Sequence, residues 1–85
     1  MFVVTSYDIS SPKGYHILSI CRRYLTWVQK SLFEGNISEK QLKKMVQELQ
    51  KEIENDDSIV IYTYLYNQNN KIIIGKDKSK QYKFI

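Results

Sequence analysis

Asp8 is the residue of this sequence that is best placed for chemistry. It ends the apolar, β-rich opening segment 1–9, and the Ser10-Ser11-Pro12 stretch that follows is typical of a helix start, with a hydroxyl as cap. A carboxylate there lies beside a helix N-terminus, which attracts anions. One carboxylate is a poor Mg²⁺ site, because this ion usually takes one or two carboxylates with water and phosphate oxygens. If two copies pair about a two-fold axis, Asp8 occurs twice, and one shared Mg²⁺ could polarise a phosphodiester.

A structural role for Asp8 competes with this interpretation, because aspartate is common just before a helix, where it caps free N–H groups.

The rest of the sequence excludes several other catalytic centres. With one histidine, one cysteine and three scattered glycines, it has no Ser-His-Asp spacing, no Cys/His metal cluster and no glycine-rich phosphate loop. Any enzymatic activity therefore depends on few groups.

Positive charge is unevenly distributed along the chain, whose formal net charge is +4. Segment 9–33 contains no acidic residue, whereas seven acids outnumber four lysines in segment 34–57. Such asymmetry suits a polyanion held on one surface. The acid-free segment supplies the candidate nucleic-acid contacts, which are Lys13, His16, Arg22, Arg23 and Lys30. An ordinary solvated surface explains the same charges equally well, and nothing positions the histidine for acid–base catalysis.

The periodicity of apolar residues predicts the elements that position these groups. Segments 1–9, 59–66 and 71–75 have the composition of strands, 67–70 that of a turn, and segment 26–33 is either one bent strand or a hairpin. Two amphipathic helices separate the strands, the second starting at a Ser38–Gln41 capping box. This β-α-β-α-β-β order predicts an α+β, ferredoxin-like sandwich in which an antiparallel sheet carries two helices on one face.

The other face of such a sheet is bare unless another molecule covers it. A chain of 85 residues has a marginal core, and self-association is an ordinary remedy, so we expect a homodimer packed through the sheets. Tyr62, Tyr64 and Tyr66 alternate along the third strand. They suit a packed interface, or they stack RNA bases as in RNA-recognition modules, although the glycine and phenylalanine pattern of those modules is absent. Trp27 is expected to pack at the start of its strand.

Composition and length set the remaining expectations. We expect one ferredoxin-like domain over residues 1–75, followed by a lysine-rich linker and a short edge strand over 76–85. No apolar stretch approaches the ~20 residues of a membrane span, and no signal peptide is visible. The single cysteine, Cys21, cannot form an internal disulfide and is expected to be buried. These features favour a cytoplasmic protein without a membrane partner.

Three stretches together resemble the small CRISPR-associated endoribonuclease, the smaller partner of the integrase in spacer acquisition: FVVTSYDIS at 2–10, CRRYLTWVQKSLFEGNIS at 21–38 and IVIYTY at 59–64. The resemblance covers nearly the whole chain. It implies a ferredoxin-like homodimer with a metal-binding aspartate at the end of the first strand, and Mg²⁺-dependent cleavage of single-stranded RNA or duplex DNA. It also implies a role as the central dimer that bridges two integrase dimers and carries incoming DNA.

The resemblance also assigns roles to individual residues. Tyr7 and Asp8 match the family's strand-end pair, and Phe33 matches the aromatic residue of its SVFE motif, here SLFE. These three are therefore the candidate catalytic residues, with Asp8 as the Mg²⁺ ligand, although core packing is favoured for Phe33. Gln29 and Ser31 match the same motif.

Two departures from the family weaken the expectation of catalysis. Members with nuclease activity often carry arginines where this chain has Gly14-Tyr15-His16, and one where it has Trp27. Arginine binds phosphate through a planar fork that tyrosine and tryptophan lack. Three functions therefore stay open: a metal-dependent nuclease, a non-catalytic adaptor that docks DNA and the integrase, and a stand-alone RNA-binding or toxin-like nuclease. The terminal YKFI, 82–85, resembles a last strand that pairs with the partner subunit or the integrase.

Overall fold

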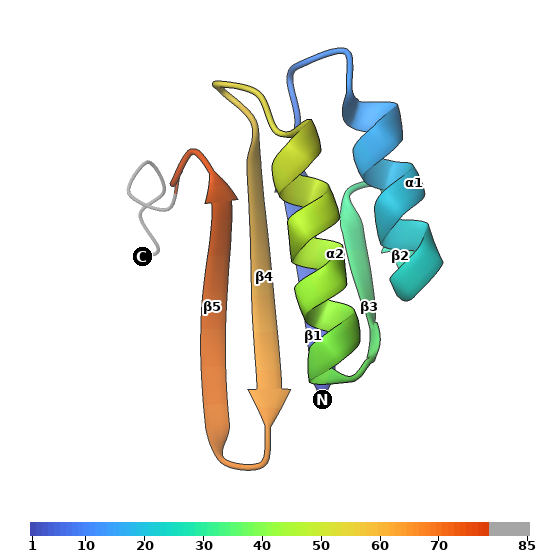
Figure 1. The fold of residues 1–85 in the computed structure, drawn as a ribbon, viewed down its shortest axis with the longest axis vertical. Helices are drawn as coiled ribbons and strands as arrows, with labels where there is room; N and C mark the ends of the chain where they lie inside the picture. The colour runs from blue at the N-terminus through green and yellow to red at the C-terminus, as the bar shows by residue number, and fades with distance from the viewer. Residues whose placement is uncertain (79–85) are drawn as a thin grey trace.

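The computed structural model describes residues 1–78, and the strand expected within 79–85 lies outside the described residues. The elements are β1 (Phe2–Asp8), α1 (Gly14–Tyr24), β2 (Thr26–Gln29), β3 (Leu32–Asn36), α2 (Glu39–Glu52), β4 (Ser58–Leu65) and β5 (Gln68–Gly75). All neighbouring strands pair antiparallel in one sheet of order β2-β3-β1-β4-β5. Both helices lie on the same face of this sheet (Figure 1). The α+β, ferredoxin-like prediction is confirmed, and segment 26–33 contains a hairpin turn rather than one bent strand.

The central strand, β1, separates the two faces of the sheet. Val3 and Thr5 are fully buried beneath the helices, whereas Phe2 and Val4, which alternate with them along the strand, are only half-buried. Because successive side chains of a strand point to opposite faces, Asp8 belongs to the same face as Phe2 and Val4. We call this side, away from both helices, the open face. The core lies on the other side, and its fully buried apolar residues are Val3, Ile17, Cys21, Phe33, Met45, Leu49, Ile59 and Ile61.

The two helices begin in different ways. At α2 the predicted capping box is confirmed, because the Ser38 hydroxyl accepts the Gln41 N–H at 3.1 Å and the Gln41 side chain accepts the Ser38 N–H at 2.9 Å. The predicted serine cap of α1 is wrong: the helix starts at Gly14, after Lys13, and its N-cap makes no side-chain hydrogen bond. The Ser11 hydroxyl instead accepts the Lys13 N–H at 3.3 Å, before the helix begins, and donates to Asp57 at 2.7 Å, so it joins the loop to a distant carboxylate.

The β4–β5 hairpin is longer than the sequence predicted. Its turn is the pair Tyr66-Asn67, with Tyr66 at φ 53°, and β5 already begins at Gln68. The predicted turn over 67–70 is therefore wrong, because polar composition does not prevent an edge strand from pairing when a two-residue turn brings it back. No helix among residues 1–78 is long and apolar enough to cross a membrane.

Candidate metal and nucleic-acid site

Asp8 stands exposed at the end of β1, on the open face. Its side chain is 61% exposed, and its Oδ2 accepts a hydrogen bond from the ammonium of Lys78 at 2.9 Å. The Lys78 side chain is only 17% exposed, so it lies against the protein rather than in solvent. The strand-end carboxylate predicted from the sequence is thus accessible, and a cation from the other end of the described chain occupies one of its oxygens.

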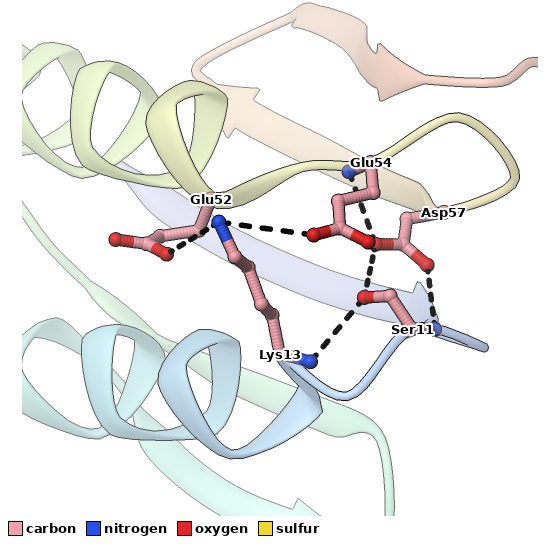
Figure 2. Close-up of polar contacts among 5 residues, drawn as sticks. All are labelled: Ser11, Lys13, Glu52, Glu54 and Asp57. Carbon is pink, nitrogen blue, oxygen red and sulfur yellow. Dashed lines mark hydrogen bonds and ion pairs between the residues drawn. The ribbon is translucent and has the colours of Figure 1, made fainter.

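The structural role that competes with catalysis belongs to another carboxylate, Asp57, which accepts hydrogen bonds from the loop after β1. Its Oδ1 accepts the N–H groups of Ser10 and Ser11 at 3.0 and 3.1 Å, directly after the strand that ends at Asp8. Its Oδ2 accepts the Ser11 hydroxyl at 2.7 Å and the Glu54 N–H at 3.1 Å. Figure 2 shows Asp57 between the two loops that it joins. Asp8 is therefore not needed to satisfy this loop.

Sequence reasoning missed Asp57, because it lies in a short polar run after α2 that indicates only a helix end. The residue is fully buried. Burial alone would raise the pKa of its carboxyl, but hydrogen bonds from the Ser11 hydroxyl and from the N–H groups of Ser11, Glu54 and Ser10 lower it below its ordinary value. Asp57 therefore stays ionised and ties the β1–α1 loop to the α2–β4 loop.

The backbone of Asp57 also directs the segment that carries Lys78. Its carbonyl oxygen accepts the Lys76 N–H at 2.9 Å. Gly75 has φ +84°, and a Cβ added there would lie 2.3 Å from the same carbonyl oxygen. Only glycine fits this close approach with this backbone conformation. The turn after β5 is thus fixed at the end of the sheet where Lys78 meets Asp8.

Tyr7 and Phe33 support the strand end from the helix side of the sheet. The Tyr7 ring stacks on the Phe33 ring with 6.2 Å between centroids, and its N–H donates to the Ser31 carbonyl at 3.1 Å. Its hydroxyl donates to the Lys30 carbonyl at 3.4 Å. Burial raises the pKa of the Tyr7 phenol, which therefore remains a protonated donor at neutral pH. Phe33 is fully buried, so in the single chain it positions Tyr7 and does not reach solvent.

A hollow of about 620 Å³ lies at the same end of the sheet as Asp8. Its lining residues come from β1 and from the β2–β3 turn, and are Ser6, Gln29, Lys30, Ser31 and Leu32. Ser6 pairs with Leu32 and belongs to the open face, as Asp8 does. Gln29 and Ser31, two residues of the SLFE-containing motif, therefore line a hollow beside the strand that ends in the candidate metal ligand.

The predicted basic residues are not equally available to a polyanion, because α2 and the loop after it supply acids that the acid-free segment lacks. Lys13 lies 3.8 Å from both Glu52 and Glu54 (Figure 2). Arg23 pairs with Glu48. Hydrogen bonds from Tyr24 and Arg23 lower the pKa of Glu48, which keeps this partner ionised.

The other predicted cations remain available. Within residues 1–78, no carboxylate lies at ion-pair distance from Arg22 or Lys30. His16 is exposed, with its ring edge-on to Tyr15 at 6.3 Å. Trp27, expected to be packed, is half-exposed on the edge strand β2, where its ring lies 5.6 Å from the Arg22 guanidinium carbon. The expected packing of Trp27 is wrong because nothing in the described chain covers β2 from outside.

A single copy of the described chain offers few ligands for a metal ion. Residues 1–78 contain no group of three or more His, Cys, Asp or Glu side chains that could hold an ion together. Asp8 supplies a hard carboxylate oxygen, which is the donor type that Mg²⁺ prefers. The donor chemistry fits Mg²⁺, and the remaining ligands would have to be water, phosphate oxygens or a second copy of Asp8.

Fold and site together define a small ferredoxin-like α+β protein with an accessible carboxylate at one end of its sheet and, nearby, cations that have no carboxylate partner within residues 1–78, a combination suited to phosphodiester ligands. The family model described as CRISPR associated protein Cas2 matches residues 1–72, and the chain belongs to this family.

Individual proteins agree with this assignment. The chain is 32% identical over 85 residues to the CRISPR-associated endoribonuclease Cas2 of Dictyoglomus turgidum, covering 95% of this chain and 98% of the relative. It is 37% identical over 84 residues to the protein of the same name from Nanoarchaeum equitans, covering 95% and 91%. A solved structure titled "Crystal structure of cas2" matches all of this chain and 98% of its own, with 31% identity and a TM-score of 0.75.

Proposed function

We propose that this protein is a metal-dependent endoribonuclease of CRISPR adaptation, which works as a homodimer and also serves as the central dimer of the integrase complex. The observation that supports nuclease activity is the position of Asp8, an accessible carboxylate at the end of a strand. Asp57, and not Asp8, accepts the hydrogen bonds of the loop that follows. Relatives that match nearly the whole chain are named endoribonucleases, which supports RNA as a substrate. Duplex DNA is proposed as a second ligand.

Asp8 would hold Mg²⁺ as one of two identical carboxylates, one from each subunit. When bound, the ion polarises a phosphodiester and lowers the pKa of a bound water. Tyr7 keeps the strand end in place through its two bonds to the β2–β3 turn, while Lys30 and Arg22 offer positive charge to phosphates. Phe33 acts from the core by supporting Tyr7.

The homodimer is supported by the open face of the sheet. The half-buried or exposed apolar and aromatic residues of this face are Phe2, Val4, Leu32, Val60, Tyr62, Tyr64 and Ile73. The Phe2 and Tyr64 rings already contact each other across β1 and β4, at 6.3 Å between centroids. A second copy would bury this surface and add to a small core. Sedimentation should therefore give a dimer for the wild type and a monomer for Tyr62→Lys; a monomeric wild type would contradict this part.

Cleavage is tested with end-labelled single-stranded RNA and duplex DNA, in Mg²⁺ or in EDTA. We expect Mg²⁺-dependent cleavage by the wild type and by Asp56→Asn, and background cleavage by Asp8→Asn. Asp56 is the matched control because it is an exposed carboxylate at the same end of the molecule. Equal cleavage by the wild type and Asp8→Asn would remove the nuclease proposal.

A non-catalytic adaptor is the second candidate, and the Lys78–Asp8 ion pair favours it, because a bound ammonium leaves the carboxylate less free for a metal. An adaptor should bind duplex DNA through phosphates, with an affinity that falls steeply with salt at a slope of about −0.9 per phosphate contacted. It should also co-purify with the integrase when the two are co-expressed. A flat salt response would count against the adaptor, and failure to co-purify would favour a stand-alone nuclease.

A further inference from the structure

Two aromatic side chains that the fold leaves uncovered flank Arg22. Tyr15, on α1, is 76% exposed, and Trp27, on β2, is 50% exposed. Tyr15 and Arg22 lie seven residues apart on one helix, so they share a face, and they line a hollow of about 240 Å³ with Leu18, Ser19 and Arg23. Arg22 also lies over the Trp27 ring at 5.6 Å. One guanidinium thus connects a hollow on the helix to an exposed indole on the edge strand.

The indole is held in place before any ligand arrives. Trp27 Nε1–H donates to the Lys30 carbonyl at 3.0 Å, and Arg22 contacts the ring as a cation–π partner. A ring fixed in this way loses little conformational freedom when a flat ligand stacks against it. Solvent exposure of a large, fixed aromatic surface beside cations is the physical arrangement with which proteins bind unpaired bases.

The charge around the ring suits a phosphate backbone. Within the described residues, Arg22 and Lys30 have no carboxylate at ion-pair distance, whereas Arg23 is neutralised by Glu48. The attraction for phosphate therefore comes from Arg22, which lies over the Trp27 ring, and from Lys30, whose carbonyl accepts the indole N–H. A protein partner with an acidic surface would be drawn by the same charges, but it would not need two exposed aromatic faces.

One carbonyl group, that of Lys30, connects Trp27 to the strand that carries the candidate metal ligand. The Lys30 carbonyl accepts both the Trp27 indole N–H and the Tyr7 hydroxyl, and Tyr7 directly precedes Asp8. The β2–β3 turn thus connects the stacking surface to the end of the strand that carries Asp8. A strand of nucleic acid held on Trp27 would approach the sheet end at this turn.

We propose that Tyr15, Arg22 and Trp27 form a binding platform for the unpaired bases of single-stranded RNA. The inference rests on the proposed function and selects single-stranded RNA over a duplex as the ligand of this surface, because a duplex hides the base faces that an aromatic platform binds. Arg22 and Lys30 contact phosphates, while the two aromatic rings stack on bases.

The experiment uses Trp27 as its own reporter, since it is the only tryptophan in the chain. Three probes of the same length, about ten nucleotides, are titrated in EDTA: a single-stranded RNA, its duplex, and an abasic strand that keeps the phosphates. We expect the single strand to quench Trp27 fluorescence and to bind roughly tenfold more tightly than the abasic strand. Anisotropy of labelled RNA should show roughly tenfold weaker binding for Tyr15→Ala and Trp27→Ala, with binding largely kept by Trp27→Phe.

Tyr66→Asn is the matched control, because it removes an aromatic side chain that is 97% exposed at the opposite end of the sheet and keeps a residue suited to positive φ. It should bind like the wild type, and thermal melts check that every variant folds. Equal affinity for the abasic and natural strands, or tighter binding of the duplex, would overturn the platform. The Asp8→Asn variant separates the two proposals. If it binds single-stranded RNA through the bases but does not cleave it, both proposals are supported. Binding that does not depend on the bases would contradict only the platform, and cleavage equal to that of the wild type would contradict only the nuclease.

Discussion

Replacing Asp57 by asparagine should destabilise the fold more than its small chemical change suggests. The carboxylate accepts four hydrogen bonds at full burial. Asparagine can keep Oδ1 for the Ser10 and Ser11 N–H groups, but its amide nitrogen would face the Glu54 N–H, donor against donor. Bonds to a charged acceptor contribute about 1.5–3 kcal/mol against about 0.5–1.5 for neutral ones, and a buried unpaired donor costs about 1–3. We therefore expect a loss of roughly 2–4 kcal/mol.

The assay is urea unfolding followed by circular dichroism, with Tm as a second measure. For a domain of this size each kcal/mol shifts Tm by about 4–8 °C, so Asp57→Asn should melt roughly 10–30 °C lower. The control is Asp56→Asn. The Asp56 side chain is 77% exposed and its carboxylate forms a long ion pair with the Lys76 ammonium, at 3.9 Å, so this change should alter the unfolding free energy by about 0–1 kcal/mol. If the two asparagine variants were equally stable, Asp57 would not be the joint between the two loops.

The pH dependence gives an independent check of the same reasoning. Hydrogen bonds hold the pKa of Asp57 below its ordinary value, so its contribution to stability is present above the unfolded pKa of about 3.9 and is lost as pH falls further toward the folded pKa. The difference in unfolding free energy between the wild type and Asp57→Asn should therefore shrink on acidification below about pH 4. A constant difference from pH 7 to pH 3 would show that the charge of Asp57 is not what stabilises the loop.

Three further changes test other parts of the structure. Phe33→Ala should cost about 3–5 kcal/mol in urea unfolding, because Phe33 is fully buried, and a cost below about 1 would place it outside the core. Burial raises the pKa of Cys21 to about 12, so Cys21 should react with a thiol reagent only after unfolding; rapid labelling of the native protein would contradict its burial. Lys78→Gln should raise the affinity of Asp8 for Mn²⁺, measured by electron paramagnetic resonance, whereas Lys76→Gln should not; unchanged affinity would mean that Lys78 does not compete with the metal.

The sequence predicted most of the fold because its elements carry local patterns. The β-rich composition of β1, the capping box at Ser38 and the apolar spacing of both helices are properties of a few neighbouring residues, and the structure has a strand or a helix at each of them. The predictions that were wrong concerned residues whose hydrogen-bond partners lie elsewhere in the sequence. Ser11 is not the N-cap of α1: its hydroxyl accepts the Lys13 N–H at 3.3 Å just before the helix and donates to Asp57, from the loop before β4. The polar residues 67–70 were assigned to a turn, although pairing with β4 makes Gln68, Asn69 and Asn70 part of a strand.

The candidate site shows the same division. Asp8 could be found because a charged residue at the end of an apolar strand stands out in the sequence, and the resemblance marked it as well. Which cations are available to a polyanion could not be predicted, because the acids that neutralise Lys13 and Arg23 come from α2 and the loop after it, which are distant in sequence but pack beside α1 in space. Trp27 was expected to pack because large aromatics usually do; its exposure follows from the edge position of β2 in the sheet order.

Asp8 and Asp57 lie at the same end of the sheet, and the structure divides two tasks between them. Loops that leave a strand end present free N–H groups, and a nearby carboxylate is the natural acceptor for them. Had Asp8 taken that role, its oxygens would be saturated by backbone donors and unable to bind a metal. Because Asp57 comes from a different loop and accepts all four bonds, Asp8 keeps its oxygens for a cation. The cation present in the chain itself is Lys78, whose segment is fixed by the Asp57 carbonyl. Asp57 therefore satisfies the loop in place of Asp8 and also holds the segment that carries Lys78, so a metal that binds through Asp8 Oδ2 would have to displace Lys78 from that oxygen.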